Sequence, residues 1–362
     1  MFEEREWNRT TFTIASTATY DIYILLNAPV LQYVYIQHNP KVHQLFIEHC
    51  ALVSIPKTIS NLPTLRKLSI RFCRLRYLNM YDFLHVPTLS TIDLAHNQIA
   101  TVYEPPVKGT RLPTRELFLN NNSLHHANMS WFSTMENLTC LHLDCNHLEE
   151  LDASVPMPTL HELSVAYNRL RTLDLSRWSF LSSLSIVYVN NNHLTSAPVG
   201  WSSLVRLEVL DLSCNHIGSF LMDDLYLTKV RRLSLATNEL TTVTTSMLHL
   251  RVPLEMLQLS KNRLSVLDVS RWDMPNLWEL NVANNRLTEL GDTFTRFPSL
   301  GSLLNLSQNV WSCRWLASIH PAELKAKRYA KLSTNDSCVD RKHMISEQLW
   351  ICCWDEAPKN AQ

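Results

Sequence analysis

The sequence predicts an α/β solenoid, a chain coiled into about 12 short turns that share one hydrophobic core. Two observations lead to this fold class. A pattern of apolar residues, clearest in Leu207–Ile217 as L-x-x-L-x-L-x-x-N-x-L, returns along most of the 362 residues. One slot in the pattern, usually asparagine, recurs every 22–25 residues. The slots are Cys50, Cys73, Asn97, Asn122, Asn146, Asn168, Asn192, Asn215, Asn238, Asn262, Asn285 and Asn309.

This pattern is that of a leucine-rich repeat. In the segment L-x-L, alternate residues point to opposite faces of a strand, so the two leucines face inward together. One repeat cannot bury its leucines, whereas a stack of repeats forms a continuous core. We therefore expect a horseshoe in which the short strands form a parallel sheet on the concave face.

The slot asparagine lies where the chain turns after each strand. Its amide offers both donors and an acceptor to backbone groups that would otherwise be buried without partners. Because such a group costs about 1–3 kcal/mol, stacked asparagines are expected to form a hydrogen-bonded ladder. Cys50 and Cys73 fill the first two slots with small side chains that bond weakly, so we expect these two repeats to be less rigid.

The chain order predicts four regions. Residues 1–41 form an N-terminal cap with degenerate repeats, and the repeats follow at 42–311. A C-terminal cysteine cap covers residues 312–356, with a basic helix candidate at 322–332, and a tail occupies 357–362. Repeats of 22–25 residues leave little room, so their convex segments should be extended or loosely turned rather than long helices.

The composition argues against several classes of protein. The 33 basic and 33 acidic residues give a net charge of +0, whereas a nucleic-acid surface requires a basic excess. No run of 18 apolar residues exists, so no membrane span is expected. The charged start, Met1–Glu6, lacks a following apolar core, so no secretory signal is expected within this chain. Neither a nucleophile motif nor a glycine-rich phosphate loop occurs, so we expect no enzyme and no cofactor.

The C-terminal cap carries the most specific pattern. Residues 304–313 read Leu-Asn-Leu-Ser-Gln-Asn-Val-Trp-Ser-Cys, and Cys338 and the vicinal pair Cys352 and Cys353 follow. With the segment Trp-Asn-Arg-Thr-Thr-Phe at 7–12, this pattern resembles the leucine-rich immune proteins of mosquitoes, the LRIM-type family, over about residues 7–356. Most members carry a coiled coil after the double cysteine, and this chain, which shows no heptads there, resembles a coil-less or truncated member.

The resemblance implies a protein secreted into the haemolymph. It also implies partners, namely complement-like thioester proteins or other leucine-rich immune proteins. We therefore predict a secreted leucine-rich repeat protein of innate immunity that binds other proteins in a complement-like pathogen defence. The alternative is a generic leucine-rich repeat receptor ectodomain or scaffold. Glycosylation triplets are consistent with secretion and start at Asn8, Asn121, Asn128, Asn137, Asn305 and Asn335.

The cap of such extracellular proteins also implies a cysteine pairing. It has two early cysteines, spaced C-x-C, which pair with two later ones, and here Trp315 stands at the second early position. We therefore predict a disulfide between Cys313 and Cys338. At least one of Cys352 and Cys353 is then expected to be available to another chain, which gives a monomer or a disulfide-linked dimer.

The predicted concave face consists of the outward strand residues. Its middle column mixes aromatic and polar side chains and reads Phe46, Ser69, Asp93, Phe118, His142, Ser164, Tyr188, Asp211, Ser234, Gln258, Asn281 and Asn305. The candidates for protein binding, taken from this column and its flank, are Phe46, Phe118, His142, Tyr188, Asp211 and Trp278. The alternative is a solvated sheet face, with binding elsewhere on the molecule.

The strand around residues 140–145 combines two cysteines with His142 and Asp144, which raises the question of a metal site. At the equivalent position, the neighbouring repeats carry Phe118 and Ser164, which are not metal ligands, so we expect no metal there. Three cysteines lie in strand regions too far apart to bridge and are expected to be free thiols: Cys140, Cys145 and Cys214.

Overall fold

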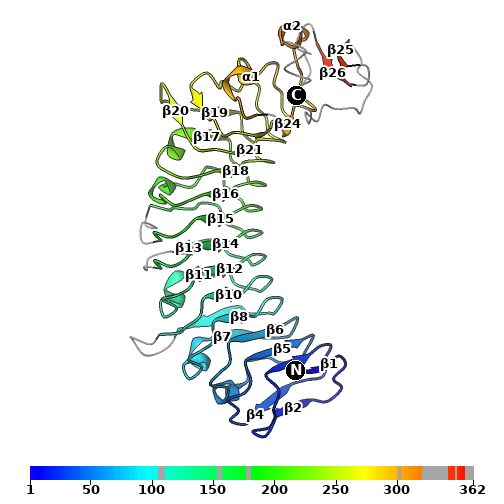
Figure 1. Ribbon diagram of the computed structural model, residues 1–362, viewed down its shortest axis with the longest axis vertical. Helices are drawn as coiled ribbons and strands as arrows, with labels where there is room; N and C mark the ends of the chain where they lie inside the picture. Colours follow the sequence, from blue (N-terminus) through cyan, green and yellow to red (C-terminus); the bar gives the residue numbers. More distant parts are fainter. Residues whose placement is uncertain are drawn as a thin grey trace. The chain divides into compact units, whose positions relative to one another are not determined.

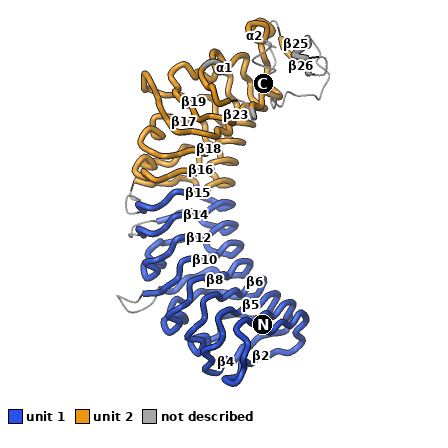
Figure 2. The backbone as a smooth tube through the Cα atoms, viewed as in Figure 1, with its two compact units in different colours: residues 1–170, 177–185 blue, residues 171–176, 186–362 orange. Residues whose placement is uncertain are grey.

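The computed structural model describes residues 1–104, 111–152, 157–176, 181–300, 303–319, 341–346 and 349–354 (Figure 1). The chain forms two compact units, shown in different colours in Figure 2. Unit 1 comprises residues 1–170 and 177–185, and unit 2 comprises residues 171–176 and 186–362. Within the described ranges, no helix combines the length and the apolar character needed to cross a membrane.

Unit 1 is built on a parallel sheet that takes one strand from each successive turn of the chain. Its strands, in sheet order, are β1 (Phe2–Glu4), β3 (Ile22–Leu25), β5 (Gln44–Glu48), β6 (Lys67–Arg71), β8 (Thr91–Asp93), β10 (Glu116–Phe118), β12 (Cys140–His142) and β14 (Glu162–Ser164). The strands pair without a shift in register, so the inward leucines Leu45, Leu68 and Leu117 lie in one row. The sheet also extends into residues 1–41 through β1 and β3.

Unit 2 repeats this arrangement. Its strands are β15 (Ile186–Tyr188), β16 (Val209–Asp211), β18 (Arg232–Ser234), β21 (Met256–Gln258), β23 (Glu279–Asn281) and β24 (Leu303–Asn305), all parallel. In both units, the central residue of each three-residue strand points inward and its neighbours point outward, except in the edge strand β1, where Glu3 is exposed. The parallel-sheet leucine-rich repeat solenoid predicted from the sequence is thereby confirmed.

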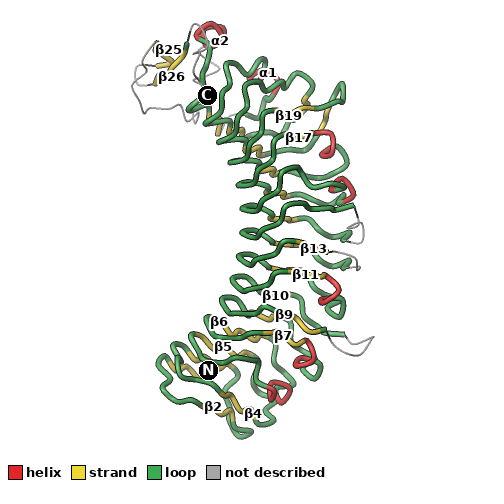
Figure 3. Tube along the Cα trace, turned by 180° about the vertical axis from the view of Figure 1, so that it is seen from behind, coloured by secondary structure: helices red, strands yellow, loops and turns green. Residues whose placement is uncertain are grey.

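Where the structure describes it, the second half of the repeat is extended or turned, as predicted (Figure 3). In unit 1, short parallel pairs join β2 (Thr11–Ile14) to β4 (Tyr33–Ile36), β7 (Tyr77–Asn79) to β9 (Thr101–Tyr103), and β11 (His126–Asn128) to β13 (Glu150–Asp152). In unit 2 they join β17 (Ser219–Leu221) to β19 (Thr242–Thr244), and β20 (Leu250–Arg251) to β22 (Trp272–Asp273). Single helical turns are η1 (Lys57–Asn61), η2 (Met80–Phe83), η3 (Met129–Phe132), η5 (Trp201–Ser203), η6 (Met222–Leu225) and α1 (Thr293–Arg296).

The core of each unit lies between the sheet and these second halves. From β3 onward, the inward strand residues are leucine, isoleucine, valine or tyrosine and are buried. The wider second half of the repeat is filled by larger side chains, with Phe83 and Phe132 fully buried in unit 1, and Trp201, Phe220 and Trp272 in unit 2. Such side chains bury large apolar areas, so they stabilise the second half of the repeat.

The asparagine ladder is present as predicted. The amide nitrogen of Asn215 donates to the carbonyls of Leu212 at 3.0 Å and of Ser213 at 3.2 Å in its own turn. It also donates to the carbonyl of Val189 in the preceding repeat at 3.1 Å. Its Oδ1 accepts from the backbone N–H of Leu194 at 3.0 Å. One side chain therefore satisfies four backbone groups, and the same pattern recurs at neighbouring slots.

Replacing Asn215 by alanine is expected to lower the free energy of unfolding by about 1–3 kcal/mol, because it leaves buried backbone groups without partners. Asn276, an exposed asparagine of the same unit, is the matched control, and its alanine variant should change stability little. Denaturant unfolding followed by circular dichroism measures both variants. Equal, small changes would show that the ladder does not stabilise the fold.

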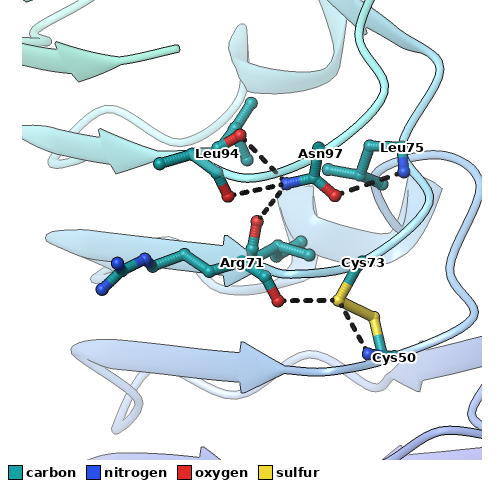
Figure 4. Close-up of a disulfide and its surroundings, with 8 residues drawn as sticks. Cys50, Arg71, Cys73, Leu75, Leu94 and Asn97 are labelled. Carbon is teal, nitrogen blue, oxygen red and sulfur yellow. Dashed lines mark hydrogen bonds between the residues drawn. A yellow bond between two sulfur atoms is a disulfide. The ribbon is translucent and has the colours of Figure 1, made fainter. Parts of the chain in front are cut away.

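The first two slots are joined by a disulfide, which the sequence interpretation missed. Cys50 and Cys73 are bonded, with their Cα atoms 4.5 Å apart (Figure 4). Neighbouring parallel strands lie roughly 4.8 Å apart, so cysteines in consecutive slots fall within bridging range. Figure 4 also shows the first asparagine of the ladder, Asn97, which donates to the Leu94 carbonyl and accepts from the N–H of Leu75. The expectation that these two slots bond only weakly is corrected, because a disulfide joins them.

In the C-terminal cap, the disulfide pairing differs from the predicted one. Cys313 forms a disulfide with Cys353, with 4.9 Å between their Cα atoms, and not with Cys338 as predicted. Cys338, the predicted helix at 322–332 and the predicted tail at 357–362 lie outside the described residues. The cause is local: the N–H of Cys313 donates to the carbonyl of Trp354 at 3.1 Å, and the N–H of Trp354 donates to the carbonyl of Trp311 at 2.9 Å. These bonds hold the end of the hairpin formed by β25 (Arg341–Ser346) and β26 (Leu349–Cys353) against α2 (Cys313–Ser318).

Both vicinal cysteines are already in disulfides. Cys353 bonds to Cys313, and Cys352 is disulfide-bonded as well. The prediction that one of Cys352 and Cys353 is available to another chain is therefore wrong. The predicted free thiols are confirmed at Cys140, Cys145 and Cys214.

Candidate binding surface

The outward residues of the unit 1 sheet form two columns, here called the unit 1 sheet face. The strand register aligns the middle column as predicted: Phe46, Ser69, Asp93, Phe118, His142 and Ser164. A second column, one position before the inward leucines, reads Gln44, Lys67, Thr91, Glu116, Cys140 and Glu162. Phe46 and Phe118 are half-buried, so each still offers part of its ring to solvent.

An ionic cluster occupies the early strands of this face. The guanidinium of Arg71 lies 4.0 Å from Glu48 and 3.7 Å from Asp93, and Ser69 donates to Asp93 at 3.4 Å. The ammonium of Lys67 lies 5.5 Å from the centre of the Phe46 ring, within cation–π range. Partly exposed pairs of this kind contribute little to stability, so their main effect is to fix the orientation of the charges.

A row of aromatic rings borders the early strands. His49 and Phe72 stack at 4.8 Å between ring centres, and Phe72 and His96 stack at 4.2 Å. The Phe72 side chain is 39% exposed although it is large and apolar. Each of the three residues directly precedes a ladder slot and has a positive φ of 52–56°, which turns its side chain outward from the coil. The sequence interpretation missed this row because it considered strand residues alone.

His142 is the centre of the most connected part of the unit 1 sheet face. Its Nε2 lies 3.0 Å from a carboxylate oxygen of Glu162, and its Nδ1 lies 3.7 Å from Asp144. The Phe118 ring meets the imidazole edge-on, with 5.1 Å between the ring centres. Asp144 is itself held, since it accepts from the Ser164 hydroxyl and from the N–H of Ala166. The predicted candidates Phe118 and His142 are therefore brought together, with two acidic groups that the prediction had not included.

Cys140 lies beside Glu162 in the strand register and is half-buried. Burial raises the pKa of its thiol to about 12, and the neighbouring charges of Glu162, Glu116 and Asp144 act in the same direction. The thiol is therefore neutral over the physiological range.

Alkylation of Cys140 by iodoacetamide at pH 8 is expected to be at least about 100-fold slower in the native protein than in denaturant, because only the thiolate reacts. Peptide mass mapping after timed quenching measures the rate at this cysteine separately from the others. Similar rates in the folded and unfolded chain would contradict the raised pKa.

The unit 2 sheet face is more polar. Its middle column, in register, is Tyr188, Asp211, Ser234, Gln258, Asn281 and Asn305, as predicted. Asp211 accepts a hydrogen bond from the N–H of Ser213 at 2.9 Å, so it also stabilises the turn that follows β16. Gln258 donates to Glu279, a buried carboxyl whose pKa is raised by its burial. Trp278 is half-buried and directly precedes β23. Three strands separate β15, which carries Tyr188, from β23, which follows Trp278, so these two side chains do not form one cluster.

Comparisons with known proteins place these features in context. A family model described as "Leucine rich repeat" matches residues 114–170 and 228–287, and another described as "Leucine Rich Repeat" matches residues 206–226. The human (Homo sapiens) "Leucine-rich repeats and immunoglobulin-like domains protein 1" is 30% identical over 155 residues, which is 42% of this chain and 14% of that protein. Bovine (Bos taurus) osteomodulin is 24% identical over 300 residues, 82% of this chain and 64% of that protein. The chain thus spans less than two thirds of either relative.

Solved structures show the same fold. The LRIM1/APL1C complex superposes with a TM-score of 0.68 at 17% identity, covering 96% of this chain and 69% of that one. The leucine-rich repeat domain of APL1 gives a TM-score of 0.62 at 20% identity, covering 95% and 97%. The repeat matches, the strand register and the asparagine ladder together show that both units have the fold of stacked leucine-rich repeats.

Proposed function

We propose that this chain is a secreted protein of innate immunity that binds other proteins, in a complement-like pathogen defence, through the unit 1 sheet face. The observation that carries the binding function is the composition of that face. Half-buried aromatic rings at Phe46 and Phe118 lie beside charges whose orientation is fixed by Arg71, Asp93 and His142. Aromatic residues and arginine are enriched where proteins meet.

Secretion is supported by the cysteines. The bonds Cys50–Cys73 and Cys313–Cys353 are structural disulfides that hold the first slots and the C-terminal cap. Such bonds form and persist in oxidising compartments such as the extracellular space. The immune role is supported by the cap pattern, which resembles that of mosquito leucine-rich immune proteins, and by the fold shared with the LRIM1/APL1C complex.

The partners that this proposal implies are complement-like thioester proteins or other leucine-rich immune proteins. With both vicinal cysteines engaged, binding is expected to be non-covalent, and the chain is expected to act as a monomer on its own. A small number of central aromatic and arginine side chains usually carries most of the binding energy at such a surface.

The direct experiment is a pull-down from mosquito haemolymph with the immobilised full chain. A complement-like thioester protein or a second leucine-rich immune protein should be recovered. The double variant Phe46→Ala, Phe118→Ala should recover at least about tenfold less of that partner. Tyr226→Ala is the matched control, since Tyr226 is 51% exposed and lies outside the sheet. Failure to recover either class of protein, or equal recovery by all variants, would contradict the proposal.

The second candidate is a generic leucine-rich repeat receptor ectodomain or scaffold. The observation that favours it is the similarity to vertebrate repeat proteins, such as bovine osteomodulin, over 82% of the chain. Silencing the gene in the source animal before infection separates the two functions. Altered pathogen survival supports the immune role, whereas unchanged survival together with a partner unrelated to defence supports the scaffold.

A further inference from the structure

Three side chains of different chemistry converge on the unit 1 sheet face. Cys140 and His142 are the two outward residues of β12, and Glu162 is the first residue of β14, in register with Cys140. The thiol sulfur, an imidazole nitrogen and a carboxylate oxygen all lie within 4.8 Å of one another. Over the ranges that the structure describes, this is the one set of three or more histidine, cysteine or acidic side chains close enough to share an ion.

We propose that Cys140, His142 and Glu162 form a zinc site on the unit 1 sheet face. Zn²⁺ is bound by this combination of sulfur, nitrogen and oxygen at about 2.0–2.3 Å, which places tetrahedral ligand atoms roughly 3.3–3.8 Å apart. The three atoms need only side-chain rotation to reach that spacing, because the strand register already fixes their Cα positions. The site goes beyond the proposed binding function and does not depend on it.

The proposed ion would lie between His142 and Glu162, which are hydrogen-bonded in the free protein. Nε2 of His142 and Oε1 of Glu162 are 3.0 Å apart, so the protonated Nε2 donates a hydrogen bond to the carboxylate. An ion bound between the same two atoms would replace that proton, while the Cys140 thiol would release its own proton to solvent. A nitrogen and an oxygen ligand therefore already face each other, and the sulfur lies on the same side of the sheet.

The surroundings of His142 match those of metal-binding histidines. Its other ring nitrogen, Nδ1, faces Asp144 at 3.7 Å, the arrangement that orients an imidazole and makes it a stronger ligand. Asp144 is fixed in turn by Ser164 and by the N–H of Ala166. Glu116 occupies the position next to Cys140 on β10, so a third carboxylate favours a cation at this place.

The site would be open on one side. All three ligands are half-buried, and they project from the sheet into the space where a partner is proposed to bind. Three protein ligands leave the fourth position of a tetrahedral zinc ion for water or for a side chain of another molecule. The sequence predicts no metal here because Phe118 and Ser164 are the neighbours of His142 in its own column. The third ligand comes instead from the column of Cys140.

The test uses Co²⁺ as a spectroscopic probe of the full-length, disulfide-intact chain. One equivalent of Co²⁺ is expected to give a sulfur-to-cobalt charge-transfer band, which Zn²⁺ displaces. Cys140→Ser should abolish the band, and Glu162→Gln should weaken zinc binding, measured by competition with a chelator, at least about tenfold. Cys145→Ser is the matched control, since Cys145 is a free, half-buried thiol outside the trio.

Circular dichroism and thermal melting of each variant show whether it is folded, and the near-isosteric Glu162→Gln keeps the test valid if Cys140→Ser unfolds. Absence of a sulfur band in the wild-type chain would overturn the proposal. It would also fail if the band persisted in Cys140→Ser, or if cobalt bound through histidines alone. None of these outcomes bears on the haemolymph pull-down, so the two proposals fail separately.

Discussion

Replacing Gly200 by alanine is expected to destabilise unit 2 by on the order of 3 kcal/mol or more. Gly200 has a φ of +77°, a conformation that is strained for residues with a side chain. A Cβ atom at this position would lie 2.5 Å from the backbone N and Cα atoms of Ser176, which cannot move aside without shifting the chain. The strain would be transmitted to η5, whose first residue, Trp201, is fully buried.

Gly218→Ala is the matched control, because it is a glycine of the same unit with no atom within 4 Å of the added Cβ. Denaturant unfolding should show a large loss for Gly200→Ala and a change near zero for Gly218→Ala. If the two variants unfold at the same denaturant concentration, the close approach to Ser176 is not a constraint on the fold.

Removing the disulfide between Cys50 and Cys73 is expected to destabilise the early strands of unit 1 by about 3 kcal/mol, given the 23 residues that separate its cysteines. The double variant Cys50→Ala, Cys73→Ala loses both the cross-link and the sulfur that accepts from the N–H of Cys50 at 3.2 Å. Hydrogen exchange of the amides in β5 and β6 measures the local free energy of opening, which is more informative than a global melt in a repeat protein.

The rescue variant Cys50→Asn, Cys73→Asn sharpens this test. Asparagine at both slots would extend the ladder that starts at Asn97, so part of the lost protection should return. Protection equal to wild type in the alanine variant would show that the disulfide does not stabilise these repeats. An asparagine variant no better than alanine would show that the first turns cannot accept the ladder geometry.

The repeat fold and the middle column were predictable because both depend on local spacing. A two-residue alternation decides which strand residues face outward, and the 22–25-residue step decides which of them are neighbours. This spacing alone places residues as different as Phe46 and Asp93 in one column, as the strand register does. The Cys50–Cys73 bond was implied by the same logic, since consecutive slots are neighbours in space.

Other features depend on contacts that no local spacing encodes. The partner of Cys313 is decided by the hairpin of the cap, in which β26 returns so that Trp354 bonds to the backbone at Trp311 and Cys313. The grouping of Glu162 and Asp144 around His142 depends on side-chain rotamers and on the second outward column. The stack at Phe72 depends on a backbone conformation that its residue type does not favour.

The positive-φ positions have a consequence for how this protein can vary. The residue before each slot has a φ of 52–57° although none of these residues is glycine, and the set includes histidine, phenylalanine, tyrosine, threonine, lysine and glutamine. The conformation is therefore imposed by the hydrogen bonds of the adjacent turn rather than by the residue itself. Such positions hold side chains of many types, while the leucines beneath them stay unchanged. They form an edge along each unit where new specificities can evolve without repacking the interior.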